Sequence, residues 1–317
     1  MTMKLIMLVL GVSLSIGCRA NGADPGSQGH EWKAKVRVVG QDGGPVKGAT
    51  VTIGFYVPAP ANESIGMDKV TGVTDSSGIF TASHKDNSVD LFFSGWKEGY
   101  YKSAQTYELG MQYQYDPVKW SPDITFMLKK VIDPIPMYAK KIRQGPPVAD
   151  KPVGYDLEVG DWMPPYGKGI HMDVIFTARL TKFGEDDWDY KLVVSFPNPG
   201  DGIQPFTLSE NEKTSALRSP HRAPLSGYLE QWIKTQSQHP GEAAPSRFDE
   251  KLNFFLRVRT TLDEKGVVKT ANYGKIYGDF MNFRYYYNPV VNSANLEFDP
   301  GKNLLKNLSH IEKVGEP

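Results

Sequence analysis

The sequence predicts a mainly β protein, in which an N-terminal β-sandwich is followed by a second antiparallel β domain with one covering α-helix. Apolar residues alternate with polar ones over many short segments, and glycine- and proline-rich turns separate these segments. The composition of 31 Gly, 23 Pro, 16 Tyr and 15 Phe also favours strands and turns over long helices. With 317 residues, the chain is long enough for two domains that each bury a core.

The first domain is expected at residues 31–130. Apolar residues occupy every second position of 32–38 and alternate with charged ones, which is the pattern of a half-buried strand. Further strands are expected at 49–57, 69–74, 79–83, 89–94 and 124–130, with a Tyr-rich insertion at 101–120. The side chains expected inside this sandwich are Val36, Val38, Val51, Ile53, Phe80, Leu91, Phe126 and Leu128.

Two turns define the first domain. Gly43 and Gly44 can supply a positive φ in the first turn, and Gly78 can do so in the second, where Asp75 can accept hydrogen bonds from its own backbone. The order V-x-x-D-G-G-P-V-x-G-A-x-V, G-x-T-D-x-x-G-x-F and K-x-G-Y over residues 36–103 resembles the carboxypeptidase regulatory-like (transthyretin-like, prealbumin-like) β-sandwich. This resemblance implies a fold and an exported protein, and it implies no chemistry.

The N-terminus has the features of an export signal. A weakly basic start is followed by an apolar run at 5–16 that is too short to span a membrane. The run ends at Gly17-Cys18, and Cys18 is the only cysteine of the chain, so an intrachain disulfide is excluded. The position of Cys18 resembles the lipobox of bacterial lipoproteins, although Ser15 stands where that box usually has Leu. Residues 1–18 are therefore expected to be a lipoprotein signal peptide and 19–30 a flexible tether; the alternative is ordinary cleavage after Ala20 or Gly22.

The rest of the chain is divided by a proline-rich stretch. Residues 131–153 hold five prolines and are expected to be a docked linker, 154–305 a second β domain and 306–317 a tail. Strands are expected at 170–180, 190–196, 252–260, 269–277, 280–287 and 295–298, and the first two form a hairpin across a turn at 183–187. Leu225, Leu229, Trp232 and Ile233 recur at helical spacing, which predicts the covering helix, and 209–217 is expected to be a shorter helix.

The sequence offers little chemistry. No nucleophile, metalloprotease, phosphate-loop or dinucleotide motif is present, so no catalytic residue, metal or cofactor is assigned. His171 and Asp173 are two residues apart on an expected strand, which allows metal binding, but two solvent-facing polar residues are the favoured interpretation. The acidic turn at 185–189 lacks the pattern of a calcium loop and is interpreted as a solvated turn. The balance of 36 basic and 36 acidic residues gives no footprint for nucleic acid, and contact with a membrane is expected only through the N-terminal lipid.

Aromatic residues are the main candidates for ligand binding. Three consecutive tyrosines at 285–287 must point to both faces of a strand, so at least one ring is expected to leave the core. Exposed rings can stack on sugars, whereas the alternative is that tyrosine is simply a good strand residue. The candidate ligand-binding aromatics are Trp162, Tyr166, Tyr273, Tyr277, Tyr285, Tyr286 and Tyr287.

A second resemblance covers most of the mature chain. The segments PMYAK at 136–140, GDW at 160–162, PYGKG at 165–169, YGKIYGD at 273–279 and NLEFDP at 295–300 look like an uncharacterised family of secreted bacterial proteins. That resemblance implies that the two domains belong together, and no activity comes with it.

These features together predict a non-enzymatic binding or scaffolding protein of the cell envelope, either periplasmic or at the cell surface. Its expected partner is a glycan or another envelope protein. Two alternatives remain open, namely an extracytoplasmic hydrolase of glycan or peptide and a structural accessory subunit of an envelope complex. A hydrolase would show a pocket with convergent carboxylates or histidines, whereas a glycan binder would show a row of exposed rings.

Overall fold

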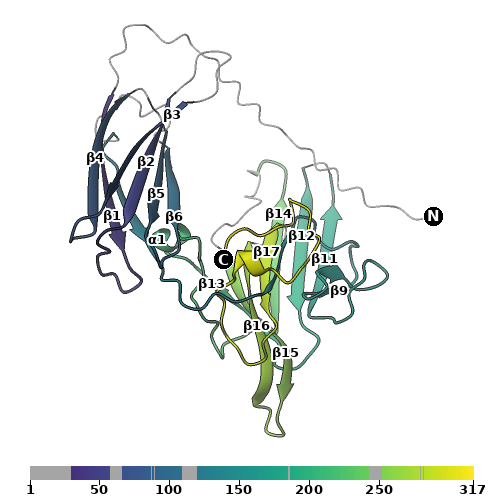
Figure 1. Cartoon of the computed structure of the whole chain (residues 1–317). Coiled ribbons are helices and arrows are strands. Elements are labelled where there is room, and N and C mark those ends of the chain that lie inside the picture. Colours follow the sequence, from purple (N-terminus) through teal and green to yellow (C-terminus); the bar gives the residue numbers. More distant parts are fainter. Residues whose placement is uncertain are drawn as a thin grey trace. The chain divides into compact units, whose positions relative to one another are not determined.

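A computed structural model describes residues 30–57, 66–86, 88, 90–108, 120–184, 186–242, 252–278, 280 and 282–317 (Figure 1). The chain forms two compact units. Unit 1 comprises the residues up to Val131 together with Glu210–Ala216, and unit 2 comprises Ile132–Ser209 and Leu217–Pro317. The predicted signal peptide, Cys18 and the predicted tether up to residue 29 lie outside the described residues.

Unit 1 is a β-sandwich of two sheets. One sheet has the strand order β4-β1-β7 and the other has the order β3-β2-β5-β6. All neighbouring strands are antiparallel except β1 and β7, which are parallel. The strands are β1 (His30–Val39), β2 (Thr50–Val57), β3 (Gly66–Val73), β4 (Ile79–Asp86), β5 (Asp90–Trp96), β6 (Ser103–Glu108) and β7 (Asp123–Met127).

The alternation of apolar and polar residues in the sequence correctly identifies most side chains in the core of unit 1. Of the eight side chains expected inside, seven are buried and Phe80 is partly buried against the same cluster. Trp32 is fully buried at the start of β1. The mainly β class with an N-terminal β-sandwich is thus confirmed. β6 is an addition, because it lies at the beginning of the segment expected to be a Tyr-rich insertion.

The two predicted turns have the expected backbone geometry. Gly43 and Gly78 have φ values of 76° and 72°, whereas Gly44 does not have a positive φ. The Asp75 carboxylate accepts hydrogen bonds from the backbone N–H groups of Ser77 and Ile79, at 2.8 and 2.9 Å. A short aspartate side chain therefore holds the second turn, while glycine supplies the left-handed conformation that other residues adopt at a cost.

A segment from later in the chain completes unit 1. Of the shorter helix predicted at 209–217, only the single turn α1 (Glu210–Lys213) is present. Glu212 on α1 lies 3.4 Å from the ammonium of Lys129. The following residues bond to β6, since the N–H of Ala104 donates to the carbonyl of Thr214 at 2.9 Å. The segment thus extends the edge of the four-stranded sheet.

Unit 2 pairs two five-stranded sheets, with strand orders β10-β9-β11-β12-β14 and β13-β15-β16-β17-β8. All neighbouring strands are antiparallel. The strands of the first sheet are β9 (Val153–Asp156), β10 (Asp161–Trp162), β11 (Val174–Lys182), β12 (Trp188–Ser195) and β14 (Gln231–Gln238). Those of the second are β8 (Tyr138–Ile142), β13 (Gly202–Phe206), β15 (Asn253–Leu262), β16 (Val268–Gly278) and β17 (Phe283–Asn288). The predicted β11–β12 hairpin is confirmed.

The second sheet of unit 2 is buried on both faces. One face carries Leu256 and Tyr285 into the core that it shares with the first sheet. Its other face carries Tyr277 and Tyr286 into a cluster with Met137 and other apolar residues from the chain before β8 and after β17. Consequently β16 and β17 are buried at nearly every position rather than at alternate ones.

The covering helix predicted at 225–233 is wrong. Leu225 is 67% exposed and Leu229 47% exposed, and β14 begins at Gln231 with strictly alternating burial. Gly227 has φ 86°, a left-handed conformation that interrupts any helix. The apolar spacing had a helical period by coincidence, and pairing of β14 with β12 decided the structure.

The proline-rich stretch at 131–153 contains β8, which forms the edge of the second sheet. The buried carboxylate of Glu297 fixes the beginning of that stretch, because it accepts the N–H groups of Ile132 at 3.0 Å and Asp133 at 2.7 Å. The residues expected to form a tail also pack on β8, since the Lys141 N–H donates to the Glu312 carbonyl at 2.9 Å and Val314 is buried.

Candidate functional site

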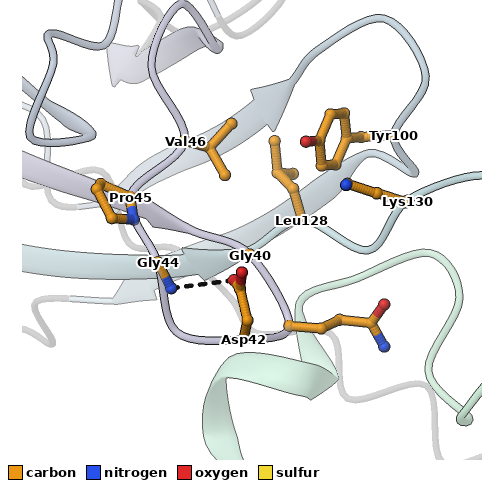
Figure 2. Close-up of a pocket in the computed structure, with 9 residues that line it drawn as sticks. Gly40, Asp42, Gly44, Pro45, Val46, Tyr100, Leu128 and Lys130 are labelled. Carbon is orange, nitrogen blue, oxygen red and sulfur yellow. Dashed lines mark hydrogen bonds between the residues drawn. The ribbon is translucent and has the colours of Figure 1, made fainter.

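A pocket in unit 1 lies beside the first predicted turn and has a volume of about 300 Å³ (Figure 2). Nine residues line it: Gly40, Gln41, Asp42, Gly44, Pro45, Val46, Tyr100, Leu128 and Lys130. Val46 and Leu128 are buried, so part of the wall is apolar. The Asp42 carboxylate accepts the Gly44 N–H at 3.0 Å, as the dashed line in Figure 2 shows.

A backbone hydrogen bond closes the turn that forms one side of the pocket. The Gly40 N–H donates to the Gly44 carbonyl at 2.8 Å, and a Cβ atom on Gly40 would lie 2.8 Å from Oδ1 of Asp42. Asp42 is the only carboxylate among the nine lining residues. General acid–base chemistry of the glycosidase type uses two, so this pocket by itself offers a binding surface and no such pair.

A group of charged side chains in unit 2 surrounds Arg259. Its guanidinium binds Asp173 through Nε at 2.7 Å and Nη2 at 3.1 Å, and Nη1 lies 2.9 Å from Glu158. The ring of Tyr287 lies beneath the guanidinium at 5.2 Å. Asp156 is a more distant partner, at 3.9 Å. Asp156 and Asp173 are almost completely buried.

A bulge in β15 directs Arg259 to this position. The pairing of β15 with β16 shifts between Val258 and Thr261, and Arg259 has φ 53°. The extra residue of a bulge re-aims the side chains around it, so Arg259 reaches Asp173 just before β11. A left-handed conformation is uncommon for arginine, and the paired carboxylates hold it in place.

Asp156 organises the loop between β9 and β11. Its Oδ1 accepts the N–H groups of Glu158 and Val159 at 2.9 and 3.0 Å, and its Oδ2 accepts those of Ile170 and His171 at 2.8 Å each. Burial alone would raise the pKa of Asp156, but these four donors together lower it. At neutral pH the carboxylate is therefore ionised and committed to backbone N–H groups.

Asp173 is held in a similar way. Its Oδ2 accepts the Leu157 N–H at 2.8 Å in addition to the arginine. Burial raises the pKa of Asp173, and the Arg259 hydrogen bond opposes that rise. The cluster therefore joins the loop, β11 and β15 at one point. Neither the bulge nor the convergence of these residues is visible in the sequence, because they are separated by up to 103 positions (259 − 156).

Most of the predicted ligand-binding aromatics lie in the core of unit 2. Five of them are at most 4% exposed: Tyr273, Tyr277, Tyr285, Tyr286 and Tyr287. The expectation that one ring of 285–287 leaves the core is wrong, because both faces of β17 are covered. Trp162 is partly buried against Tyr155 and Phe176, and Tyr166 is 42% exposed. Of the seven candidate aromatics, only Tyr166 presents a largely accessible ring.

The buried tyrosines surround a lysine that sequence reasoning missed. Lys275 on β16 is fully buried, and its ammonium lies 5.1 Å from the Tyr277 ring and 4.7 Å from the Tyr286 ring. It donates to the hydroxyl of Ser219 at 3.1 Å. Alternating burial would have placed a lysine on a solvent face, but both faces of β16 are covered from Ala271 to Tyr277.

The structure also shows where the predicted His171 and Asp173 pair and the acidic turn lie. His171 is exposed as expected, but Asp173 is buried and bound to Arg259, so the interpretation of two solvent-facing residues is wrong for Asp173. Its strand begins only at Val174, and Ile170 and Met172 are exposed. In the acidic turn, Asp187 lies 2.8 Å from His239. Among the described residues no group of three or more His, Cys, Asp or Glu side chains is arranged to hold a metal ion.

In the part of the chain that the structure describes, no helix has the length and apolar character needed to cross a membrane. Lipid attachment at Cys18 lies outside this part and stays a prediction.

Comparison with known proteins gives only distant structural similarity. No family model matches the chain, and no curated protein matches it. Among solved structures, 3-chlorocatechol 1,2-dioxygenase from Rhodococcus opacus is 14% identical, with a TM-score of 0.26, over 34% of this chain and 63% of that enzyme. A streptococcal ancillary pilin is 11% identical, with a TM-score of 0.22, over 75% of this chain and 60% of the pilin.

A shaft pilin from Lactobacillus rhamnosus is 12% identical, with a TM-score of 0.22, over 75% of this chain and 89% of the pilin. This chain thus spans less than two thirds of the length of the dioxygenase and of the ancillary pilin. TM-scores this low assign no family.

Proposed function

We propose that this chain is a non-catalytic binding or scaffolding protein of the bacterial cell envelope. The observation that carries the proposal is the use of the buried carboxylates in unit 2. Asp156 accepts four backbone N–H groups, and Asp173 accepts one together with a bidentate arginine. These two carboxylates hold a loop and two strands in place, as expected for residues with a structural role.

We assign unit 1 to the carboxypeptidase regulatory-like group of β-sandwiches. The support is the agreement between its turn motifs and the observed geometry, with Gly43 and Gly78 in the left-handed region and Asp75 bound to its own turn. Seven strands in two sheets fit this assignment. Such domains are exported modules, which agrees with the export signal at 5–16.

The proposal includes a lipid anchor at Cys18. Export places the chain outside the cytoplasm, and the single thiol stands directly at the end of the apolar run. Bacterial lipoproteins carry two or three acyl chains, and two or more give stable membrane attachment. The test is to fractionate cells that express the natural chain or its Cys18→Ser variant. The natural chain should be found with the membranes and the variant in the soluble fraction, and a soluble natural chain whose N-terminus lies beyond Cys18 would contradict the anchor.

The hydrolase alternative makes a different prediction for the same carboxylates. Asp173 is its candidate acid, because burial raises the pKa of that group. We expect Asp156→Asn and Asp173→Asn to lower the midpoint of thermal unfolding, whereas Asp150→Asn at an exposed ion pair should leave it unchanged. The purified protein would be a hydrolase if it released reducing sugar or peptide and if Asp173→Asn abolished this release without unfolding the protein. That result would contradict the proposed non-catalytic function.

A further inference from the structure

The four-stranded sheet of unit 1 (β3, β2, β5 and β6 in Figure 1) carries large apolar side chains on its outer face. Residues that are paired across these strands and point away from the core form four rows. In the strand order β3, β2, β5, β6 the rows are Val73, Thr50 and Trp96; Thr71, Thr52, Ser94 and Ala104; Lys69, Gly54, Phe92 and Thr106; and Met67, Tyr56, Asp90 and Glu108. We call this surface the outer patch.

The apolar side chains of the outer patch are open to solvent. The exposed fractions are 63% for Val73, 45% for Trp96 and 38% for Met67. Tyr56 and Phe92 are partly exposed. Met67 and Phe92 meet across Gly54, since a Cβ atom on that glycine would lie 2.6 Å from Sδ of Met67 and 3.7 Å from Cβ of Phe92. The apolar groups are therefore contiguous there and not scattered singly.

The other outer face of the same sandwich provides the contrast. The outward residues of β1 between positions 31 and 37 are Glu31, Lys33, Lys35 and Arg37. Their neighbours on β4 include Thr81 and Lys85. A polar face of this kind is solvated by water, as is usual for one side of an antiparallel sheet. Contiguous exposed apolar groups, as on the outer patch, instead mark an interaction surface.

Charge is distributed unevenly over the outer patch. Lys69 stands on β3, the first strand in the order, and Glu108 stands on β6, the last, directly opposite Asp90 on β5. Two like charges in such a pair are unfavourable in a sheet. Burial, and after it the charge of Glu108, raises the pKa of Asp90. A cation placed over the two carboxylates would offset their repulsion.

We propose that the outer patch joins two copies of this chain face to face in a dimer. A two-fold axis that runs parallel to the strands, between β2 and β5, places β3 of each copy over β6 of the other. Lys69 of one copy then lies over Thr106 of the second copy. Glu108 of the second copy is about 7 Å further along the strand, which a lysine side chain can reach.

The same rotation matches the other rows. Tyr56 of one copy lies over Asp90 of the other, where the phenol can donate a hydrogen bond to the carboxylate. Trp96 lies over Thr50 and beside Val73 of the other copy, so their exposed apolar surfaces are removed from water together. Each of these contacts occurs twice, as a two-fold axis requires.

A second copy is the occupant that the charges favour. The rotation exchanges the positive and the negative side of the outer patch, so each copy supplies the cation that the carboxylates of the other attract. Four strands and four rows cover about 19 by 27 Å, or roughly 500 Å² per copy. Two copies thus bury on the order of 1,000 Å², which is at the low end for a specific interface and predicts a weak dimer. Self-association goes beyond the proposed function, which a monomer can also perform.

The test is sedimentation equilibrium of the chain from Arg19 to Pro317. This chain contains every described residue and lacks the only cysteine, so no disulfide can join two copies. We expect a monomer–dimer equilibrium with a Kd of about 1–100 µM that weakens as salt is added. Lys69→Glu and Glu108→Lys should each raise the Kd at least about tenfold, because each brings like charges together at both symmetric contacts.

A mixture of the two charge variants tests the pairing directly. In an equimolar mixture of Lys69→Glu and Glu108→Lys, one copy carries two negative charges at these positions and the other two positive ones. The two variants should therefore form a heterodimer with near-parental affinity. Lys33→Glu and Glu31→Lys are the matched controls, since they make the same charge changes on the other outer face, and they should associate as the parent does.

A further pair of variants tests the apolar contact. Trp96→Ala should raise the Kd about tenfold, whereas Tyr166→Ala, at an exposed ring in unit 2, should leave it unchanged. All the substituted residues are exposed, and circular dichroism of each variant checks the fold. A chain that stays monomeric at about 1 mM would overturn the inference. A dimer that both charge variants leave unchanged, or a mixture of them that does not associate, would overturn it as well.

Discussion

Arg259 binds Asp173 through two guanidinium donors, at 2.7 and 3.1 Å, from a left-handed position in a bulge of β15. Removing the cation would leave three carboxylates close together, two of them buried. We expect Arg259→Gln to lower the free energy of unfolding by about 3 kcal/mol. This value is at the low end of the usual cost of breaking a buried ion pair, because the arginine side chain is 25% exposed.

Two comparisons make this prediction specific. Arg259→Lys keeps the charge but loses the planar, two-pronged donor group, so it should lower the free energy of unfolding less than Arg259→Gln does. Arg179→Gln breaks an exposed pair with Asp150 and should cost at most about 0.5 kcal/mol. Urea titration of the four proteins measures these differences, and equal costs for Arg259→Gln and Arg179→Gln would refute a structural role for the cluster.

The second prediction separates backbone strain from steric clash in unit 1. Gly78 and Gly48 have nearly the same φ, 72° and 71°. A Cβ atom on Gly78 would lie 2.5 Å from the Val38 carbonyl oxygen, whereas nothing lies within 4 Å of one on Gly48. Gly48→Ala should therefore cost about 1 kcal/mol from strain alone, and Gly78→Ala about 3 kcal/mol because β1 must also move. Thermal unfolding of both variants gives the comparison, and a Gly48→Ala variant as unstable as Gly78→Ala would be inconsistent with it.

These turns also show which parts of the structure the sequence could predict. Asp75 and Gly78 act on neighbours within four residues, so their roles can be read from local order. Alternation likewise identified the core of unit 1, where each sheet has one buried face. Strand patterns alone could not show that a second layer covers the outer side of β17, and this is why at least one ring of residues 285–287 was expected to leave the core. The cluster at Arg259 depends on a bulge and on partners distant in sequence, and no local pattern encodes either.

A third prediction concerns the buried ammonium of Lys129 in unit 1. Burial lowers the pKa of Lys129, and Glu212 at 3.4 Å opposes that effect. Glu212→Gln should therefore destabilise unit 1 by about 1–2 kcal/mol, because it removes a negatively charged partner of a desolvated cation. Lys129→Met should be close to neutral, and adding it to Glu212→Gln should restore most of the loss.

Amide hydrogen exchange of β6 provides the readout for this cycle. The Ala104 N–H bonds to the carbonyl of Thr214, two residues after Glu212, so its protection reports on the docking of α1. Exchange should be faster in Glu212→Gln and return towards the parental rate in the double variant. Additive effects of the two substitutions would show that the pair does not act as a unit.

The last prediction is a pH dependence of the C-terminal segment. Glu312 accepts hydrogen bonds from the hydroxyl of Ser309 at 2.6 Å and from its N–H at 3.0 Å, and it lies 2.9 Å from the ammonium of Lys140 on β8. These contacts, the Ser309 hydroxyl first, lower the pKa of Glu312 from 4.5 to about 2. The folded state therefore holds the proton less tightly than the unfolded state.

It follows that ionised Glu312 favours the docked segment, fully so above about pH 4.5 and progressively less as the pH falls towards 2. At pH 7 we expect Glu312→Gln to lower the melting temperature by about 1–3 °C, a small effect because the side chain is partly exposed to solvent. The difference from the parent should shrink as the pH falls from 4.5 and be mostly lost at pH 2, where the parental carboxyl is about half protonated. Glu264→Gln, at an exposed turn, should match the parent throughout. Calorimetry across this range tests the assignment, since a difference that persists unchanged at pH 2 would mean that the substitution acts through packing and not through charge.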